Sequence, residues 1–145
     1  MLLRRRSEKA EALRQVPLFA NLSQRHLDLV AREADEVPVE AGAMLARQGG
    51  LGHEFLLILD GRARVERDGK TIARLRPGDF FGEMSLIDGE PRSASVVAET
   101  PVTLLCIHGR AFNGLIETVP GLHKQLLRTL CERLRAADAA LTRRN

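Results

Sequence analysis

The chain has 145 residues, enough to bury one substantial core, and we interpret residues 1–145 as a single domain. Its 44% hydrophobic and 28% charged residues are typical of a globular protein, and no apolar run approaches the roughly 18–20 residues of a membrane span. The basic start "MLLRRRSEKAEALR" has no apolar stretch after it, so we expect no signal peptide. We therefore expect a cytoplasmic protein with no membrane span.

The net charge of +3 is mild, and much of the excess lies in Arg4–Arg6 and Arg143–Arg144. These ends fit solvated termini as well as contacts with acidic lipid or an acidic partner. Cys106 and Cys131 lack the spacing of metal ligands, so we expect both to be small buried hydrophobic residues.

Residues 1–35 have helical features. In "NLSQRHLDLVAREA", Ser23 is a suitable N-cap. Apolar residues then recur at helical spacing, at Leu27, Val30, Ala31 and Ala34.

Residues 36–108 contain short apolar runs separated by glycine-containing turns, about every eight to twelve residues. Asp60-Gly61 and Asp68-Gly69 are signals for two-residue hairpins. This pattern predicts an antiparallel β jelly-roll barrel, flanked by helices in an α+β fold.

Residues 109–145 return to a helical period. "GRAFNGLIETV" predicts a short helix that Pro120 ends. The last helix carries an apolar seam at Leu127, Leu130, Leu134, Ala137 and Leu141. Such a helix either lies on its own barrel, covers a ligand as a lid, or pairs with a second copy in a homodimer.

The stretch "FFGEMSLIDGEPRSASV", residues 80–96, carries the clearest chemistry. Gly82 permits a close backbone approach, and "EMSLI" is long enough for a turn of helix whose first amides attract an anion. Arg92 offers a planar fork of donors that fits two phosphate oxygens, whereas an ionised Glu83 accepts hydrogen bonds and suits a sugar hydroxyl. Together they suit a phosphorylated ribose; the alternative is that Glu83 and Arg92 simply pair with each other.

The longer string "RPGDFFGEMSLIDGEPRSASV" closely resembles the phosphate-binding cassette of the cyclic-nucleotide-binding domain family. The resemblance covers nearly the whole chain and is strongest to the cytoplasmic domain of bacterial cyclic-nucleotide-regulated potassium channels. It extends to "VPLFANLSQRHLDLVA", "EAGAMLARQGG" and "FLLILDGRARV", and makes the last two helices a hinge and a lid.

The resemblance implies a role for each cassette residue. Gly82 and Glu83 would hold the ribose, Met84 and Ser85 would offer backbone to the cyclic phosphate, and Arg92 would carry the charged contact. The implied ligand-binding set is Phe81, Gly82, Glu83, Met84, Ser85, Arg92, Ser93 and Ala94. The lid lacks the family's base-contacting side chains, because Ala137 is small and the chain has no Trp or Tyr. The candidate lid contacts are Arg133, Arg135 and Asp138, and the alternative is that the base is held by apolar packing.

The expected function is a sensor module that binds cyclic AMP, with cyclic GMP weaker, and passes the signal on through its C-terminal helices to an effector domain or protein. We expect no enzymatic activity, catalytic residue, cofactor, metal or nucleic acid. A cupin-type metalloenzyme would need converging histidines, but only His53-Glu54 is a local pair. A DNA-binding regulator would need a helix-turn-helix after the last helix. In that alternative the chain is a fragment of a transcription regulator without its DNA-binding domain. The remaining alternative is a degenerate interaction module that has lost its ligand.

Overall fold

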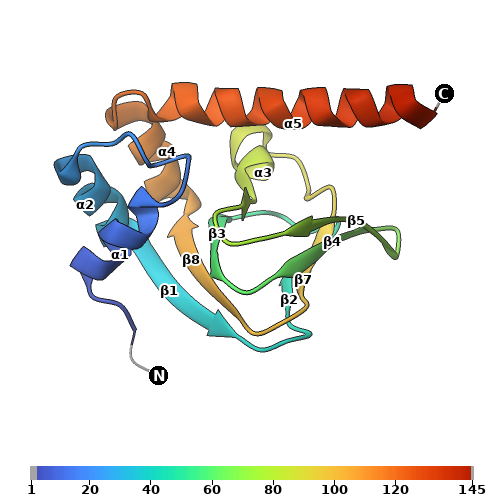
Figure 1. The fold of residues 1–145 in the computed structure, drawn as a ribbon, viewed down its shortest axis with the longest axis horizontal. Coiled ribbons are helices and arrows are strands. Elements are labelled where there is room, and N and C mark those ends of the chain that lie inside the picture. Colours follow the sequence, from blue (N-terminus) through green and yellow to red (C-terminus); the bar gives the residue numbers. More distant parts are fainter. Residues whose placement is uncertain (1–2, 145) are drawn as a thin grey trace.

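A computed structural model describes residues 3–144 of the chain, so the outermost ends of the expected 1–145 domain lie outside the described residues. Figure 1 shows a β-barrel with one long helix lying across its top. The helices are α1 (Arg6–Arg14), α2 (Gln24–Glu33), α3 (Glu83–Asp88), α4 (Gly109–Thr118) and α5 (Leu122–Arg144). None of the described helices is long and apolar enough to cross a membrane.

Within residues 3–144, eight strands form two four-stranded antiparallel sheets, one in the order β1-β8-β3-β6 and the other in the order β2-β7-β4-β5. The strands are β1 (Ala34–Val39), β2 (Met44–Ala46), β3 (Glu54–Asp60), β4 (Ala63–Arg67), β5 (Lys70–Leu75), β6 (Phe80–Phe81), β7 (Ser95–Ala98) and β8 (Val102–His108). The arrangement confirms the predicted antiparallel jelly roll flanked by helices.

The boundary between the first helices and the barrel differs slightly from the prediction. Ser23 caps α2 as expected, because its side chain accepts a hydrogen bond from the backbone amide of His26. Ala34, predicted to belong to the helix, instead begins β1, where it is paired with Ile107 of β8. It is buried either way, so the apolar pattern alone did not separate the two assignments.

The two predicted hairpins have different outcomes. Asp68-Gly69 joins the paired strands β4 and β5, and both residues have the positive φ of a tight hairpin turn. The prediction of a hairpin at Asp60-Gly61 is wrong, because β3 and β4 belong to different sheets. Gly61 has a φ of +90°, and a Cβ atom there would collide with the backbone oxygen of Pro101. The turn therefore needs glycine to pass from one sheet to the other beside β8.

The core has two parts, one between the sheets and one between the β1-β8-β3-β6 sheet and the helices. Phe55 of β3 is central to the second part. Its ring stacks on Phe112 of α4 at 4.4 Å between centroids and lies 5.2 Å from the ring of Phe80. These contacts fix α4 and β6 against the same strand, and β6 leads directly into the cassette.

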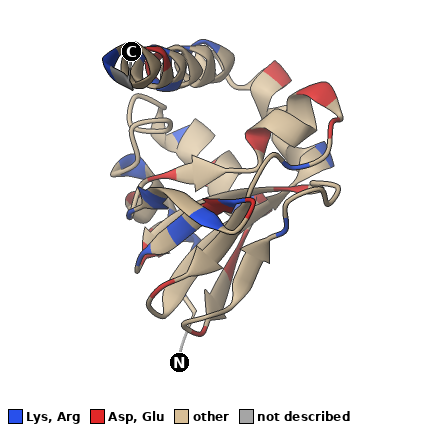
Figure 2. Cartoon of the chain, turned by 90° about the vertical axis from the view of Figure 1, so that its right-hand side faces the viewer, with Lys and Arg blue, Asp and Glu red and all other residues tan. Residues whose placement is uncertain are grey.

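The long helix α5 divides into an anchored part and an exposed part. Leu122 and Leu126 are buried in the core, and Leu130 packs against it. From Cys131 onward the described residues are exposed, so the prediction that Cys131 is buried is wrong. Figure 2 shows α5 running obliquely across the top, with charged residues along it and set apart from the sheets. The exposed members of the apolar seam are Leu127, Leu134 and Leu141, with 58%, 71% and 60% exposure.

Candidate functional site

The cassette begins at Gly82, a position that only glycine can occupy without strain. Strand β6 ends at Phe81, and Gly82 follows with a φ of +93° before α3 starts at Glu83. A Cβ atom at Gly82 would lie 2.5 Å from the backbone oxygen of Glu54 on β3. Glycine is therefore required both by the left-handed backbone and by the close approach to β3. This turn sets where Glu83 enters the site.

Arg92 is positioned by hydrogen bonds between its backbone and the loop before β3. Its amide donates to the oxygen of Gly50 and its oxygen accepts from the amide of Gly49, both at 2.8 Å. Its side chain lies beside two further glycines, since a Cβ atom would be 3.0 Å from Arg92 Nε at Gly52 and 3.6 Å from Nη1 at Gly82. The loop before β3 thus fixes the arginine, and the missing side chain at Gly52 leaves room for its guanidinium.

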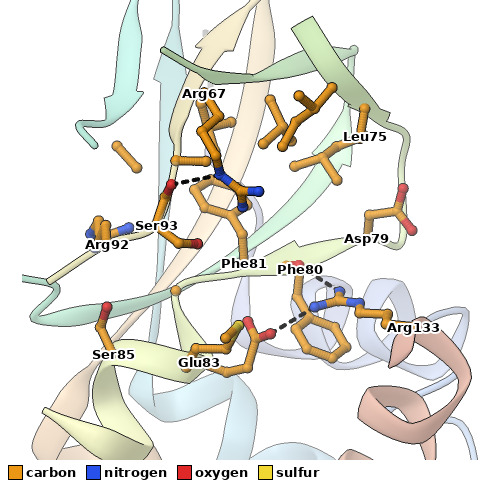
Figure 3. A pocket seen from close by; sticks show the side chains of 18 of the residues that line it. Arg67, Leu75, Asp79, Phe80, Phe81, Glu83, Ser85, Arg92, Ser93 and Arg133 are labelled. Carbon is orange, nitrogen blue, oxygen red and sulfur yellow. Dashed lines mark hydrogen bonds and ion pairs between the residues drawn. The ribbon is translucent and has the colours of Figure 1, made fainter. Parts of the chain in front are cut away.

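Glu83 is almost completely buried, with 2% exposure, and is paired with the last helix. Its Oε1 accepts from Nη1 of Arg133 on α5 at 2.6 Å. The other nitrogen, Nη2, donates to the backbone oxygen of Phe80 at 2.7 Å, and the guanidinium lies 4.3 Å from the centre of the Phe80 ring. Figure 3 shows Arg133 reaching across Phe80 to Glu83.

The second oxygen of that carboxylate, Oε2, is buried and has no hydrogen-bond partner among the described residues. Burial raises the pKa of Glu83, because a charged carboxylate is disfavoured away from water, while the positive charge of Arg133 acts to lower it. A buried acceptor without a donor is uncommon in native proteins and suggests a place for a ligand group.

The alternative in which Glu83 and Arg92 pair with each other is wrong. The ion pair of Glu83 is with Arg133, fifty residues further along the chain. Arg92 is half-buried, and no carboxylate of the described residues lies within ion-pair distance of it. The two charged groups that the sequence singled out therefore remain separate.

Both groups line one cavity of about 550 Å³, within the usual range for small-molecule sites. Its lining includes every residue of the expected set, namely Phe81, Gly82, Glu83, Met84, Ser85, Arg92, Ser93 and Ala94. In Figure 3, Arg92 and Ser93 lie on one side of the cavity, and Glu83 and Arg133 on another. One space thus combines a cationic group with a buried hydroxyl acceptor.

Sequence reasoning did not identify the opposite wall of the cavity. That wall is mainly apolar and comes from β2, β4, β5 and β7, with Ala46, Val65, Ile72, Ala73, Leu75 and Val96. Alternation along the strands could have indicated inward-facing positions, but not which of them face a cavity. Arg67 also lines the cavity, and its Nε donates to the oxygen of Ser93 at 3.0 Å. No motif in the sequence marked this arginine.

The candidate lid contacts separate into two groups. Arg133 and Ala137 line the cavity, whereas Arg135 and Asp138 are exposed and do not line it. Of the three predicted contacts, α5 therefore turns only Arg133 toward the cavity, where it holds Glu83.

Residues 3–144 contain no group of three His, Cys, Asp or Glu side chains placed to hold a metal ion. The converging histidines of the cupin alternative are thus not present in the described part of the chain. Cys106, predicted to be buried, is only half-buried. This partial burial raises the pKa of its thiol to about 12, so the thiol stays protonated at neutral pH.

Comparisons with known proteins agree with this geometry. Residues 36–119 match the model of the cyclic nucleotide-binding domain. A cyclic nucleotide-gated potassium channel of Mesorhizobium japonicum is 38% identical over 86% of this chain and 35% of its own length. The cAMP-dependent protein kinase regulatory subunit of Schizosaccharomyces pombe is 36% identical over 72% of this chain and 26% of its own length.

Among solved structures, the catabolite activator protein of Thermus thermophilus aligns with a TM-score of 0.79 and 36% identity. That alignment covers 87% of this chain and 62% of the activator chain. The chain thus spans about a third or less of the channel and kinase-subunit relatives. The family match over residues 36–119, together with a cavity that gathers the whole expected cassette, shows that this chain belongs to the cyclic nucleotide-binding domain family.

Proposed function

We propose that the chain is a sensor module that binds cyclic AMP, with cyclic GMP weaker, and has no chemistry of its own. The observation that carries the proposal is the buried Glu83 with its unpartnered oxygen, in one cavity with the half-buried Arg92. An anionic, hydroxyl-bearing ligand satisfies both groups at once. The relative named for cAMP dependence supports cyclic AMP as that ligand.

In the proposed complex, the guanidinium of Arg92 binds the cyclic phosphate, with Ser93 and the backbone of Met84 and Ser85 beside it. Glu83 accepts a hydrogen bond from the ribose 2′-hydroxyl. The apolar wall of β4 and β5 then packs against the purine, whose flat face needs no charged partner. The base contact is assigned to this wall, because Arg133 is engaged with Glu83.

The signal leaves the site through α3 and α5. Glu83 is the first residue of α3, and its carboxylate is bonded to α5, so a ligand that rearranges the cassette acts directly on the last helix. Ligand binding shifts the position of α5 only as far as the ligand prefers one arrangement over the other. The exposed leucines of α5 then offer a surface to an effector domain or to a second copy.

Thermal unfolding tests this function directly. A ligand at about 100 times its dissociation constant adds roughly 2.7 kcal/mol to the free energy of unfolding. For a chain of this length, we expect cyclic AMP to raise the melting temperature by about 5–10 °C, and linear AMP to raise it little. Arg92→Ala is the matched variant, and at the same cyclic AMP concentration it should show a much smaller rise. The absence of any shift with millimolar cyclic AMP or cyclic GMP would instead indicate a degenerate module.

A further inference from the structure

The contact between Glu83 and Arg133 connects two elements that are distant in the sequence. The guanidinium of Arg133 donates hydrogen bonds to the carboxylate of Glu83 at the start of α3 and to the backbone oxygen of Phe80 on β6. It also lies over the face of the Phe80 ring. Because the guanidinium is planar and rigid, these three contacts leave it little freedom to turn. The arginine therefore fixes the orientation of the carboxylate and favours its charged form.

Only one of the two carboxylate oxygens is used in this way. Oε1 is held by Arg133, while Oε2 is buried and has no partner among the described residues. A buried carboxylate oxygen without a donor is costly, so a hydroxyl brought by a ligand would relieve that cost. Glu83 lines the cavity, which places this acceptor where a bound molecule lies.

Arg133 favours the ionised form of the Glu83 carboxylate. Burial raises the pKa of Glu83, and the guanidinium of Arg133 opposes this rise. Other charged or titratable groups on the neighbouring elements include Asp88 of α3, Asp79 before β6, His53, Glu54 and Asp60 at the two ends of β3, Arg67 of β4, Arg92 before β7, Arg110 of α4 and Glu132 of α5. Among the described cations, only Arg133 lies within ion-pair distance of Glu83.

We propose that Arg133 is a positioning residue, which holds one oxygen of the Glu83 carboxylate and balances its charge so that the other oxygen accepts a ligand hydroxyl. This inference rests on the proposed function of the same cavity. Arg133 then acts on the ligand through Glu83. The docking of α5 and the binding of the ligand are therefore coupled, so that each of the two equilibria favours the other.

Three variants of the full chain separate this role from simple packing. Arg133→Met removes the charge and keeps an apolar stem. Arg133→Lys keeps the charge and loses the planar fork. Arg128→Met makes the same chemical change at an exposed arginine of α5 that lines neither described cavity. The Arg133 side chain is itself 41% exposed, and α5 stays anchored through Leu122 and Leu126, so all three variants are expected to fold.

The first measurement needs no ligand. The Glu83 carboxyl is titrated by NMR with 13C-labelled glutamate, and its signal is assigned by its loss in Glu83→Gln. We expect the pKa of Glu83 to rise by about one to three units in Arg133→Met, much less in Arg133→Lys, and not at all in Arg128→Met. Equal pKa values in the parent and in Arg133→Met would overturn the proposal.

The second measurement is cyclic AMP affinity against pH. Because the hydroxyl bonds best to the ionised carboxylate, affinity falls as pH drops through the pKa of Glu83. A higher pKa in Arg133→Met moves this fall to higher pH, and we expect roughly tenfold weaker binding at neutral pH that recovers in more alkaline buffer. Adding Glu83→Gln should remove the difference in pH profile between the two backgrounds, which rules out the histidines as its cause.

The two proposals fail in different ways. If the Glu83 pKa moves as expected but the parent binds no cyclic nucleotide, the sensor function is wrong and the role of Arg133 in ionising Glu83 stands. If the parent binds cyclic AMP and Arg133→Met binds with the same affinity and the same pH profile, the sensor function stands and the positioning role is wrong.

Discussion

The two charged groups of the cavity that the sequence singled out, Arg92 and Glu83, are positioned in opposite ways. Arg92 is held locally, by backbone bonds to Gly49 and Gly50 and by the space beside Gly52, and its guanidinium has no carboxylate partner among the described residues. Glu83 is almost fully buried, and one of its oxygens is already bonded to Arg133 of the last helix. One end of the cavity thus presents an unpaired charge, and the other presents a charge that the protein has partly neutralised.

This difference assigns the two ends different tasks. An unpaired guanidinium gains most from a phosphate, because the charges meet directly. A carboxylate whose charge is partly balanced by an arginine suits a neutral hydroxyl donor and couples that contact to α5. We therefore expect the Arg92 end to supply most of the affinity, and the Glu83 end to supply selectivity and the link to the helix.

The largest expected effect comes from removing the charge at the first end. Arg92→Ala should weaken cyclic AMP binding at least about 30-fold, because a desolvated charge on the ligand loses its partner. The free energy of unfolding of the ligand-free protein should change by no more than about 1 kcal/mol, since Arg92 has no ion pair there to lose. Calorimetric titration and thermal unfolding measure the two quantities.

Arg62→Ala is the control, because Arg62 is exposed and does not line the cavity. If Arg92→Ala lowers the free energy of unfolding by several kcal/mol and leaves the affinity for cyclic AMP intact, Arg92 has a structural role. The Arg92 end then does not supply most of the affinity.

Neutralising the second end should cost less. Glu83→Gln keeps an oxygen that accepts from a ribose hydroxyl but loses the charge, so we expect roughly tenfold weaker binding. The sharper readout is the ratio of affinities for cyclic AMP and its 2′-deoxy analogue, which should be smaller in the variant than in the parent. Glu90→Gln, an exposed acid of the same cassette, should leave both values unchanged. An unchanged ratio in Glu83→Gln would show that Glu83 does not meet the 2′-hydroxyl.

The sequence predicted the end of the site that is local in the chain. The turn at Gly82, the short helix and the position of Arg92 all lie within residues 80–96, where spacing and residue chemistry are directly readable. The jelly roll was equally accessible, because its turns and apolar runs recur along the chain. At Asp60-Gly61 the turn signal predicts a hairpin, but the chain passes there from one sheet to the other. Glycine is needed at this turn because of the distant Pro101, which local sequence does not reveal.

The other end was not predictable, because its partners come from remote parts of the chain. Arg133 was singled out as a contact for the base, but nothing in the sequence indicates that it bonds Glu83 and the oxygen of Phe80. The apolar wall of β4 and β5 is another such case, because strand alternation does not show which face borders the cavity. These features depend on how the sheets and α5 pack, which local patterns do not determine.

A substitution at Gly52 has the smallest expected effect, and it tests whether the Arg92 end can be changed without affecting the Glu83 end. It is absent from the cavity lining, yet a Cβ atom there would lie 2.8 Å from the Ser85 Cβ and 3.0 Å from Arg92 Nε. Ser85 is held in α3, whereas residues 47–53 belong to no helix or strand, so relieving the contact with the Ser85 Cβ is expected to shift this loop. The same loop bonds the backbone of Arg92 through Gly49 and Gly50, so Gly52→Ala should displace the guanidinium while the sheets and α3 stay in place.

We expect Gly52→Ala to weaken cyclic AMP binding by a few-fold, about 1 kcal/mol or less, because the displaced guanidinium still reaches the phosphate but with poorer alignment. Discrimination against the 2′-deoxy analogue should stay at the parent value, since the Glu83 end is untouched. Gly114→Ala in α4 is the matched control: a Cβ atom there meets nothing within 4 Å, and the change should raise stability slightly without altering affinity. If Gly52→Ala instead lowers the discrimination and leaves the affinity for cyclic AMP unchanged, the two ends are not independent, and movement of Ser85 is transmitted through α3 to Glu83.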